Sequence, residues 1–316
     1  MATLITGSGL IGASFGQYAA ARGERLVFVD FQPRHDFLKQ KLGSADYVSL
    51  QGDVLDLPAL AGIIKTHDID TVLHTAAIIA GRVAQEGYWA FNVNIQGTIN
   101  VAEAARLAGV RRVVHISTLS VYNRAFEGTG TVPETLQRGD STAYGNSKAV
   151  QELVLEAYQR LYGFELMVVR LAHVFGLGHF LGGAESGAIT HTLLTCGREG
   201  GVAKIARRQA RPLERIYAKD VGRAVDLAAT VPAPPVNVFN IGTGLVTTFD
   251  ELVAEARAIY PGLEVEVVPD GTPHVGAKQP LDLTRAKEHL GWEPQFTLGS
   301  ALQDYVSDLD ALAPGS

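Results

Sequence analysis

The fold is decided by Ala2-Thr3-Leu4-Ile5-Thr6 followed directly by Gly7-Ser8-Gly9-Leu10-Ile11-Gly12. The first run is short and apolar, as a buried strand is, and the second repeats glycine with the spacing of a phosphate-binding loop. The first glycine permits a tight turn, the second lets the backbone approach a pyrophosphate, and the third allows close packing of helix on strand. The stretch therefore predicts a strand, a turn and a helix that bind a dinucleotide.

Beyond this stretch, short β-branched runs alternate with longer segments of helical periodicity, a pattern typical of a parallel sheet. The predicted strands are Ala2–Thr6, Leu26–Asp30, Tyr47–Leu50, Thr71–Thr75, Arg112–Ile116 and Leu166–Leu171. The predicted helices are Leu10–Arg22, Pro58–His67, Trp89–Ala108 and Tyr144–Tyr162. We expect an α/β fold with a doubly wound, Rossmann-type parallel sheet and a second, smaller C-terminal domain.

The end of the second predicted strand indicates which dinucleotide is bound. Asp30 lies 23 residues after Gly7, near the position where a carboxylate accepts hydrogen bonds from the adenosine ribose. A carboxylate there repels a 2′-phosphate, so NAD is favoured over NADP. Arg34 lies four residues after Asp30 and could accommodate such a phosphate. Alternatively, it is an exposed loop residue after Pro33.

After about residue 172 the alternation gives way to a glycine-rich stretch and a mixture of short elements. Val221–Ala229 and Val238–Ile241 again have the pattern of a helix and a strand, so the chain is expected to return to the main sheet there. We predict an NAD-binding domain of residues 1–172 plus about 220–242. The substrate-binding domain is predicted at about 173–219 plus 243–316.

Composition excludes several classes of protein. The formal net charge is −6 and the pI is near 5.9, without the Lys/Arg runs of a nucleic-acid binder. No apolar run reaches the 18 or so residues of a membrane span, and the first strand leaves no room for a leader before it. The nine histidines lack metal-ligand spacing, and the single Cys196 has no internal disulfide partner. We expect a cytoplasmic protein without a metal.

Tyr144 and Lys148 are four residues apart on a predicted helix, so their side chains share one face. A free tyrosine has a pKa of about 10, and bringing it to neutrality requires about 4 kcal/mol. One positive charge about 4 Å away supplies roughly that energy at an effective dielectric near 20, and an oxidised nicotinamide adds a second. The spacing alone also occurs by chance on solvated helices, so the pair gains its meaning from the other motifs.

Those motifs occur in a fixed order along the chain. After the glycine loop and Asp30 come Leu73-His74-Thr75-Ala76-Ala77, Asn94-x-x-Gly97-Thr98, Ser117-Thr118-x-x-Val121-Tyr122, Tyr144-Gly145-x-Ser147-Lys148, Ile216-Tyr217-x-x-Asp220 and Leu290-Gly291-Trp292. With this set the chain resembles the extended short-chain dehydrogenase/reductases, the NAD-dependent epimerase/dehydratase family. The resemblance runs nearly from end to end.

The resemblance implies a hydride-transfer enzyme with NAD. It implies that Tyr144 exchanges a proton with the substrate oxygen, that Lys148 lowers the pKa of Tyr144 and holds the ribose, and that Thr118 orients the substrate. Asp53 is implied as an adenine contact and Asn94 as a residue behind the nicotinamide ribose. The implied cofactor-binding residues are Gly7, Gly9, Leu10, Ile11, Gly12, Asp30, Asp53, Val54, Thr75, Ala76, Ala77, Asn94, Ser117, Tyr144 and Lys148.

Departures from the family pattern bear on the substrate. His173 stands where nucleotide-sugar members have asparagine; it contacts substrate or packs behind a strand. The arginine that many of these members direct at a diphosphate falls at Leu213, and Arg211 or Arg215 could replace it only with different side-chain directions. Arg124 is a further candidate substrate contact, for a carboxylate.

Dehydratases of the family carry acidic residues directly after the catalytic hydroxyl. Here Leu119 and Ser120 occupy those positions, which disfavours dehydration. The leading hypothesis is an NAD-dependent oxidoreductase or epimerase of carbohydrate metabolism that acts on a sugar-like or hydroxy-acid substrate without a nucleotide. The alternatives are a nucleotide-sugar epimerase and, from another class, a non-catalytic NAD(P) sensor.

Quaternary structure is suggested by the two longest predicted helices. Trp89–Ala108 and Tyr144–Tyr162 carry more apolar residues than one buried face needs, with Leu153, Val154, Leu161 and Tyr162 spread around the second. Members of the resembled family often dimerise through these helices. We expect a homodimer, with burial of both helices inside one domain as the alternative.

Overall fold

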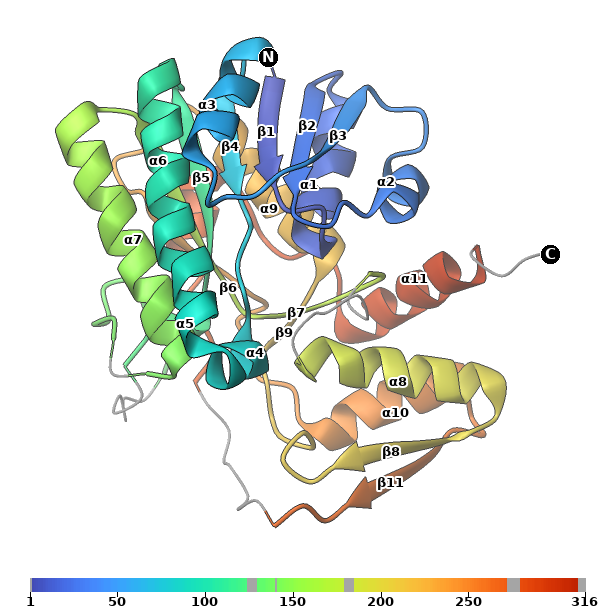
Figure 1. Cartoon of the computed structure of the whole chain (residues 1–316). Coiled ribbons are helices and arrows are strands. Elements are labelled where there is room, and N and C mark those ends of the chain that lie inside the picture. The colour runs from blue at the N-terminus through green and yellow to red at the C-terminus, as the bar shows by residue number, and fades with distance from the viewer. Residues whose placement is uncertain (1, 124–129, 140, 179–184, 272–278, 312–316) are drawn as a thin grey trace.

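Seven parallel strands form the central sheet, in the order β10-β6-β5-β4-β1-β2-β3 (Figure 1). The computed structural model describes residues 2–123, 130–139, 141–178, 185–271 and 279–311. The strands of the sheet are β1 Ala2–Thr6, β2 Arg25–Asp30, β3 Tyr47–Gln51, β4 Thr71–His74, β5 Arg112–Thr118, β6 Glu165–Leu171 and β10 Val238–Ile241. The predicted α/β class with a doubly wound parallel sheet is confirmed.

Helices cover both faces of the sheet. Along β1, Leu4 packs into one core and Ile5 into another, because successive side chains of a strand point to opposite faces. The helices on the Ile5 face are α1 Leu10–Ala21, α2 His35–Leu42 and α9 Ala218–Thr230. Those on the Leu4 face are α3 Leu57–Thr66, α6 Gly97–Ala108 and α7 Ala143–Tyr162. Burial on both faces explains why these strands are almost continuously apolar.

The helix predicted at Trp89–Ala108 is not continuous. The chain forms α4 Ala80–Gln85, α5 Gly87–Phe91, a π-helical turn η1 Asn92–Gln96, and then α6. A π turn adds a residue to one turn of the helix and commonly marks a functional position. Asn94, one of the predicted cofactor residues, lies within η1 and is fully buried.

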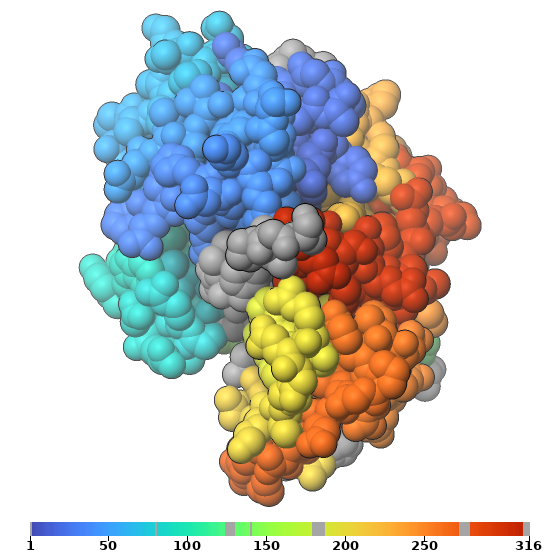
Figure 2. All heavy atoms as spheres, turned by 90° about the vertical axis from the view of Figure 1, so that its right-hand side faces the viewer, coloured from blue at the N-terminus to red at the C-terminus, as the bar shows by residue number. Residues whose placement is uncertain are grey.

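A smaller part lies below the sheet in Figure 1 and packs around its own core. It contains α8 Glu185–Glu199, α10 Phe249–Ile259, α11 Leu298–Asp310 and the parallel pair β8 Val202–Ala206 and β11 Glu264–Val268. A second parallel pair, β7 His173–Phe175 and β9 Arg215–Tyr217, lies between the two parts. Seen from the side, the red atoms near the C-terminal end lie between the blue atoms of the large part and the yellow and orange atoms of the smaller part (Figure 2).

One segment near the C-terminus packs against the large sheet. Leu281, Leu290 and Trp292 belong to the core of that sheet. The π-helical turn η4 Ala286–Leu290 belongs to this segment. The Trp292 ring nitrogen donates to the Asp220 backbone oxygen at 3.1 Å, which fastens the segment to α9. The turn η4 also contacts the edge strand β10.

The strand order places the candidate site. β1 and β4 are neighbours, and the chain leaves β1 toward one face of the sheet through α1 and enters β4 from the other through α3. Ligands of doubly wound sheets bind at such a switch point, in the crevice outside the carboxyl ends of the strands. Gly7, Thr75 and Thr118 all lie at these ends. Within the described residues, no helix combines the length and apolar character that a membrane crossing requires.

Candidate active site

The glycine loop is shaped by contacts that a side chain would prevent. Gly7 has φ +108°, and a Cβ there would lie 2.5 Å from the Thr75 hydroxyl oxygen. A Cβ on Gly12 would lie 2.6 Å from the Gly7 carbonyl oxygen and 2.9 Å from the Ile5 side chain. Gly9, the N-cap of α1, faces open space and has no capping side chain. The amides at the start of α1 are therefore available to an anion.

Asp30 holds this loop as well as facing the cavity beside it. Its Oδ2 accepts hydrogen bonds from the Ser8 amide at 2.6 Å and the Ser8 hydroxyl at 2.7 Å. Its Oδ1 accepts from the Gln32 amide at 2.9 Å. Each carboxylate oxygen can accept more than one bond, so these contacts orient Asp30 without using all its acceptor capacity.

A cavity of about 650 Å³ lies at the switch point. Eight of the predicted cofactor-binding residues line it: Gly7, Gly9, Asp30, Asp53, Val54, Thr75, Ala76 and Ala77. Sequence reasoning missed other lining residues, which are Val29, Phe31, Gln32, Pro33, Gly52, Ile78, Ile79, Arg82, Trp89 and Val93, and left the role of Arg34 open. Polar groups at one side and apolar side chains around them fit the adenosine and pyrophosphate of NAD.

Asp53 caps a turn and also lines the cavity. Its Oδ1 accepts from the Leu55 amide at 2.9 Å, which is the turn-capping role, and the residue also lines the cavity. Val54 is buried against Gly97 of α6, where a Cβ would lie 2.7 Å from a Val54 methyl group. Leu10 and Ile11 lie in the first turn of α1, outside the lining of the cavity.

Both the oxygen and the nitrogen of the Asn94 side-chain amide form hydrogen bonds with other protein groups. Its Oδ1 accepts from the Ile78 amide at 2.7 Å, and its Nδ2 donates to the Ile78 carbonyl at 3.0 Å and the Ser147 hydroxyl at 3.1 Å. All of its amide hydrogens are therefore used. Asn94 therefore links the cavity wall at Ile78 to α7, the helix that carries Tyr144 and Lys148.

Ser117 and Thr118 end β5 with different surroundings. The Ser117 hydroxyl is buried and donates to Glu152 Oε1 at 2.5 Å, so it is turned away from the cofactor cavity. Thr118 is partly exposed, and its hydroxyl oxygen accepts from the Ser120 amide at 3.2 Å as the cap of the turn Leu119–Val121. The Thr118 hydroxyl hydrogen is left for another acceptor.

Tyr144 is brought to this turn by a close backbone contact. α7 begins at Ala143 with Thr142 as its cap, so Tyr144 lies in the first turn, where the helix dipole favours negative charge. A Cβ on Gly145 would lie 2.0 Å from the Ser120 carbonyl oxygen. Only glycine allows this approach, and it sets Tyr144 beside the turn that follows Thr118. Lys148 follows one helical turn later and is 2% exposed.

The titration behaviour of the pair differs from the expectation. Burial raises the pKa of the Tyr144 phenol, with no lowering contribution from Lys148. Burial also lowers the pKa of Lys148 to about 7, although the negative charge of Glu152 acts to raise it. Each charged form loses hydration in this setting, so the two groups alone do not produce a phenolate at neutral pH. An additional positive charge, as on an oxidised nicotinamide, is needed.

The structure describes some of the residues predicted to contact substrate. His173 is half-buried in β7, its amide donates to the Glu214 carbonyl at 3.0 Å, and it pairs in register with Arg215 of β9. Arg124 lies outside the described residues. Leu213 is buried and apolar.

Arg215 is buried with an incomplete set of partners. Its Nη1 donates to the Thr247 carbonyl at 2.9 Å, while Nε and Nη2 have no partner among the described residues. Burial lowers the pKa of Arg215 to about 10, and the nearby Arg211 adds to the effect. The one carboxylate beside it in sequence, Glu214, accepts from the amides of Thr243, Gly244 and Leu281 instead.

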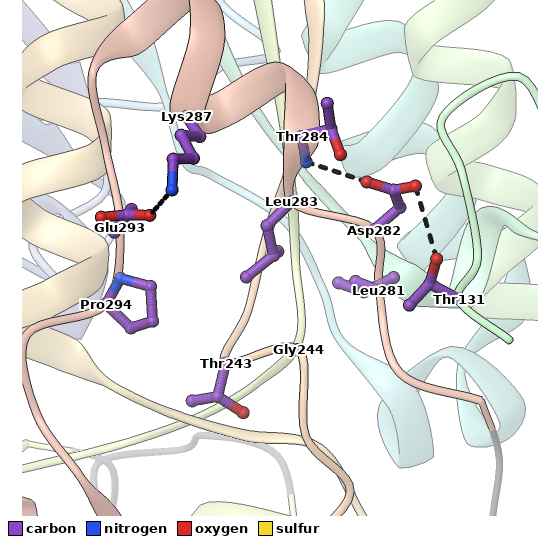
Figure 3. Close-up of a pocket in the computed structure, with 10 residues that line it drawn as sticks. All are labelled: Thr131, Thr243, Gly244, Leu281, Asp282, Leu283, Thr284, Lys287, Glu293 and Pro294. Atoms are coloured by element: carbon purple, nitrogen blue, oxygen red, sulfur yellow. Dashed lines mark hydrogen bonds and ion pairs between the residues drawn. The ribbon is translucent and has the colours of Figure 1, made fainter.

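A second cavity, of about 580 Å³, lies between Thr131 and the segment Leu281–Pro294 (Figure 3). Its charged side chains are already paired: Asp282 accepts from Thr131 and the Thr284 amide, and Lys287 pairs with Glu293 at 2.5 Å. Every charged side chain drawn in this cavity has a protein partner, so the cavity is not assigned a function.

Comparison with known proteins gives a consistent result. The model of the NAD-dependent epimerase/dehydratase family matches residues 3–242. A UDP-glucose 4-epimerase of Mycolicibacterium smegmatis is 32% identical and is covered over 97% of each chain. A dTDP-6-deoxy-L-talose 4-dehydrogenase of Kitasatospora kifunensis is 29% identical, over 95% of this chain and 93% of the relative. Among solved structures, UDP-glucose 4-epimerase of Thermotoga maritima with UDP-glucose has a TM-score of 0.83 at 25% identity, over 98% and 99% of the chains.

Proposed function

Since the chain belongs to the NAD-dependent epimerase/dehydratase family, we propose that Thr118, Tyr144 and Lys148 form its reaction centre and interconvert a secondary alcohol and a carbonyl of a sugar-like substrate. The family and its relatives establish an NAD-dependent enzyme. The observation that carries the assignment of these residues is the approach of Gly145 to the Ser120 carbonyl, which sets the start of α7 against the turn after Thr118.

Each residue of the centre has one role. Tyr144 takes the proton of the substrate hydroxyl and returns it to the carbonyl oxygen. Thr118 donates its free hydroxyl hydrogen to the same oxygen and orients it. Lys148 contributes a positive charge below the phenol. NAD supplies the hydride acceptor and, when oxidised, a positive charge that favours the Tyr144 phenolate.

The cavity at the switch point supplies the NAD site in this proposal. The amides of the first turn of α1 hold the pyrophosphate, and Asp30 accepts from the adenosine ribose. Asp53 and Val54 flank the adenine. Thr75, Ala76 and Ala77 line the path from there toward the nicotinamide.

We propose that the substrate is a nucleotide sugar. The relatives act on such substrates by name, and the unpaired guanidinium nitrogens of Arg215 favour an anionic group nearby. Leu213, apolar where a diphosphate-binding arginine was expected, favours a substrate without a nucleotide, which therefore remains the second candidate.

A panel of substrates separates the two candidates. With NAD, UDP-glucose is expected to be converted to its 4-epimer, measured by chromatography, while absorbance at 340 nm shows no net NADH. Net accumulation of NADH with the same sugar identifies a dehydrogenase instead. NADH formation with free sugars or hydroxy acids, together with no binding of UDP in calorimetry, would rule out the nucleotide-sugar proposal.

We further propose that the two parts of the protein bind different ligands. Residues 1–172 and about 220–242, joined by the segment Leu281–Trp292, hold NAD, and the remainder of 173–219 and 243–316 holds the substrate. A role in carbohydrate metabolism follows from a sugar substrate. The free Cys196 is compatible with a cytoplasmic location, which cell fractionation tests directly.

A homodimer completes the proposal. Apolar side chains are exposed along α7 and at Leu107 of α6, and Leu153 and Leu161 of α7 are 51% and 71% exposed. Exposed apolar residues grouped on two neighbouring helices mark a protein interface. We expect light scattering of the purified enzyme to give twice the mass of one chain, and Leu153→Lys to give a single chain. A monomeric wild-type enzyme at micromolar concentration would contradict the dimer.

A further inference from the structure

A single carboxylate, that of Glu152, joins three elements around the reaction centre. Glu152 is fully buried in α7, one helical turn after Lys148. Its Oε1 accepts from the Ser117 hydroxyl at 2.5 Å and Arg170 Nε at 3.0 Å. Its Oε2 accepts from Arg170 Nη2 at 2.7 Å and Arg138 Nη1 at 2.8 Å. Four charge-assisted hydrogen bonds therefore converge on one side chain.

These bonds connect the parts of the protein that carry the reacting groups. Ser117 directly precedes Thr118 in β5, and Arg170 lies in β6, the next strand of the sheet. Arg138 itself forms an antiparallel bridge with Tyr122, the residue directly after the turn that Thr118 caps. Displacing the Glu152 carboxylate would therefore loosen β5 from α7 at the level of Thr118.

The charges around Glu152 are balanced. Arg170 and Arg138 are its cations, and Arg138 also pairs with Glu156 at 2.7 Å. Burial opposes ionisation of Glu152, but the hydrogen bonds from Arg170, Ser117 and Arg138 outweigh it and lower its pKa. Glu152 is thus an anion at neutral pH.

Lys148 has few charged neighbours besides Glu152. Tyr144 precedes it on α7, and His74 of β4 and His115 of β5 lie on the sheet beneath it. Burial lowers the pKa of His74 to about 3 and that of His115 well below its usual value, so both rings are neutral. Among the residues that the structure describes, it is the negative charge of Glu152 that opposes loss of the Lys148 proton.

We propose that Glu152 is a positioning residue that holds the strand of Thr118 against the helix of Tyr144 and Lys148, and that its charge favours the protonated form of Lys148. The inference rests on the proposed roles of those three residues. Glu152 itself touches no reacting atom, because all four of its bonds go to Ser117, Arg138 and Arg170.

Two matched variants test the inference. Glu152→Gln removes the charge at nearly constant shape, and Glu156→Gln removes a carboxylate from Arg138 without touching Ser117 or Arg170. The titration midpoint of Lys148 is followed in the purified enzyme by carbon-13 NMR of labelled lysine, with the signal identified by its loss in Lys148→Arg. We expect Glu152→Gln to lower the midpoint by about one unit, because it removes a neighbouring opposite charge. Glu156→Gln is expected to leave it near the wild-type value.

Turnover of UDP-glucose gives the second readout. In Glu152→Gln, kcat is expected to fall about tenfold with a small change in KM, and the loss of activity at alkaline pH is expected to begin at lower pH. If the Lys148 midpoint moves no further in Glu152→Gln than in Glu156→Gln, the inference is wrong. The NMR titration needs no substrate, so this failure is distinct from absence of turnover, which would count against the proposed function.

A shorter carboxylate covers the case in which Glu152→Gln does not fold. Glu152→Asp keeps the charge and withdraws it by one methylene group from Ser117 and Arg138. We expect the Lys148 midpoint to stay near the wild-type value while kcat falls, because the charge remains and the fit of β5 on α7 is loosened. An unchanged kcat in Glu152→Asp would overturn the positioning role.

Discussion

Tyr144→Phe is expected to reduce turnover by about 10²- to 10⁴-fold, the usual contribution of a positioned acid or base. The phenyl ring keeps the packing of the first turn of α7, and only the hydroxyl that exchanges the substrate proton is lost. The effect should appear in kcat, since the cofactor cavity is lined by other residues. The measurement is kcat for UDP-glucose with saturating NAD.

The control for this variant is its fold and its cofactor binding. Burial already keeps the pKa of the Tyr144 phenol high, so the side chain is uncharged in the folded protein and its loss removes no ion pair. The melting temperature should therefore stay close to that of the wild type. Turnover within threefold of the wild type would exclude Tyr144 as the proton-transfer residue.

The large sheet could be predicted because its sequence pattern has a single structural solution. Runs such as Thr71–His74 and Leu166–Leu171 are apolar on both faces, which only a strand covered by helices on both sides satisfies. The π-helical turn Asn92–Gln96 could not be predicted, since its residues keep the apolar spacing of an α-helix. In the smaller part, Glu264–Val268 alternates charged and apolar residues and could have been predicted as a strand.

The backbone motifs of the candidate site could be predicted from the sequence, but the hydrogen-bond partners of several of its side chains could not. Gly7 and Gly12 are required by contacts that any such loop makes. Asn94 and Ser117 are predicted at the cofactor from the sequence, and the structure adds hydrogen-bond partners that are distant in sequence, Ile78 and Glu152. No local pattern reveals such partners.

Glu152 shows the opposite case. It follows Lys148 by the same four residues that separate Lys148 from Tyr144, so helical spacing places all three on one face. That spacing could have identified Glu152 from the sequence alone. Its partners Arg138 and Arg170 come from other elements, and the sequence gives no indication that they converge on it.

Lys148→Met is expected to abolish most activity and to stabilise the folded protein at the same time. Loss of the positive charge beside the phenol should lower kcat by about 10²-fold or more, as removal of a preorganised charge does. In the wild type, burial lowers the pKa of Lys148 to about 7, far below its value of about 10.5 in an unfolded chain. Methionine has a similar length and carries no charge to desolvate.

The sign of the stability effect depends on pH. Below pH 7 Lys148 is charged in both states, and the full cost of the buried charge, a few kcal/mol, weighs on the folded protein. As pH rises from 7 to about 10.5, the folded state has lost the proton while the unfolded state still binds it, so wild-type stability recovers. The advantage of Lys148→Met should therefore be largest near pH 6 and almost absent near pH 10.5.

Thermal unfolding of both proteins without added NAD, at pH 6 and at pH 10, measures this difference. Omitting NAD matters because a bound ligand adds its own stabilisation, and the proposed contact of Lys148 with the ribose would confuse the comparison. A melting temperature for Lys148→Met equal to that of the wild type at both values would mean that Lys148 retains its hydration in the folded state. The buried cation would then not lower the free energy of unfolding, and burial would not be the cause of a lowered Lys148 pKa.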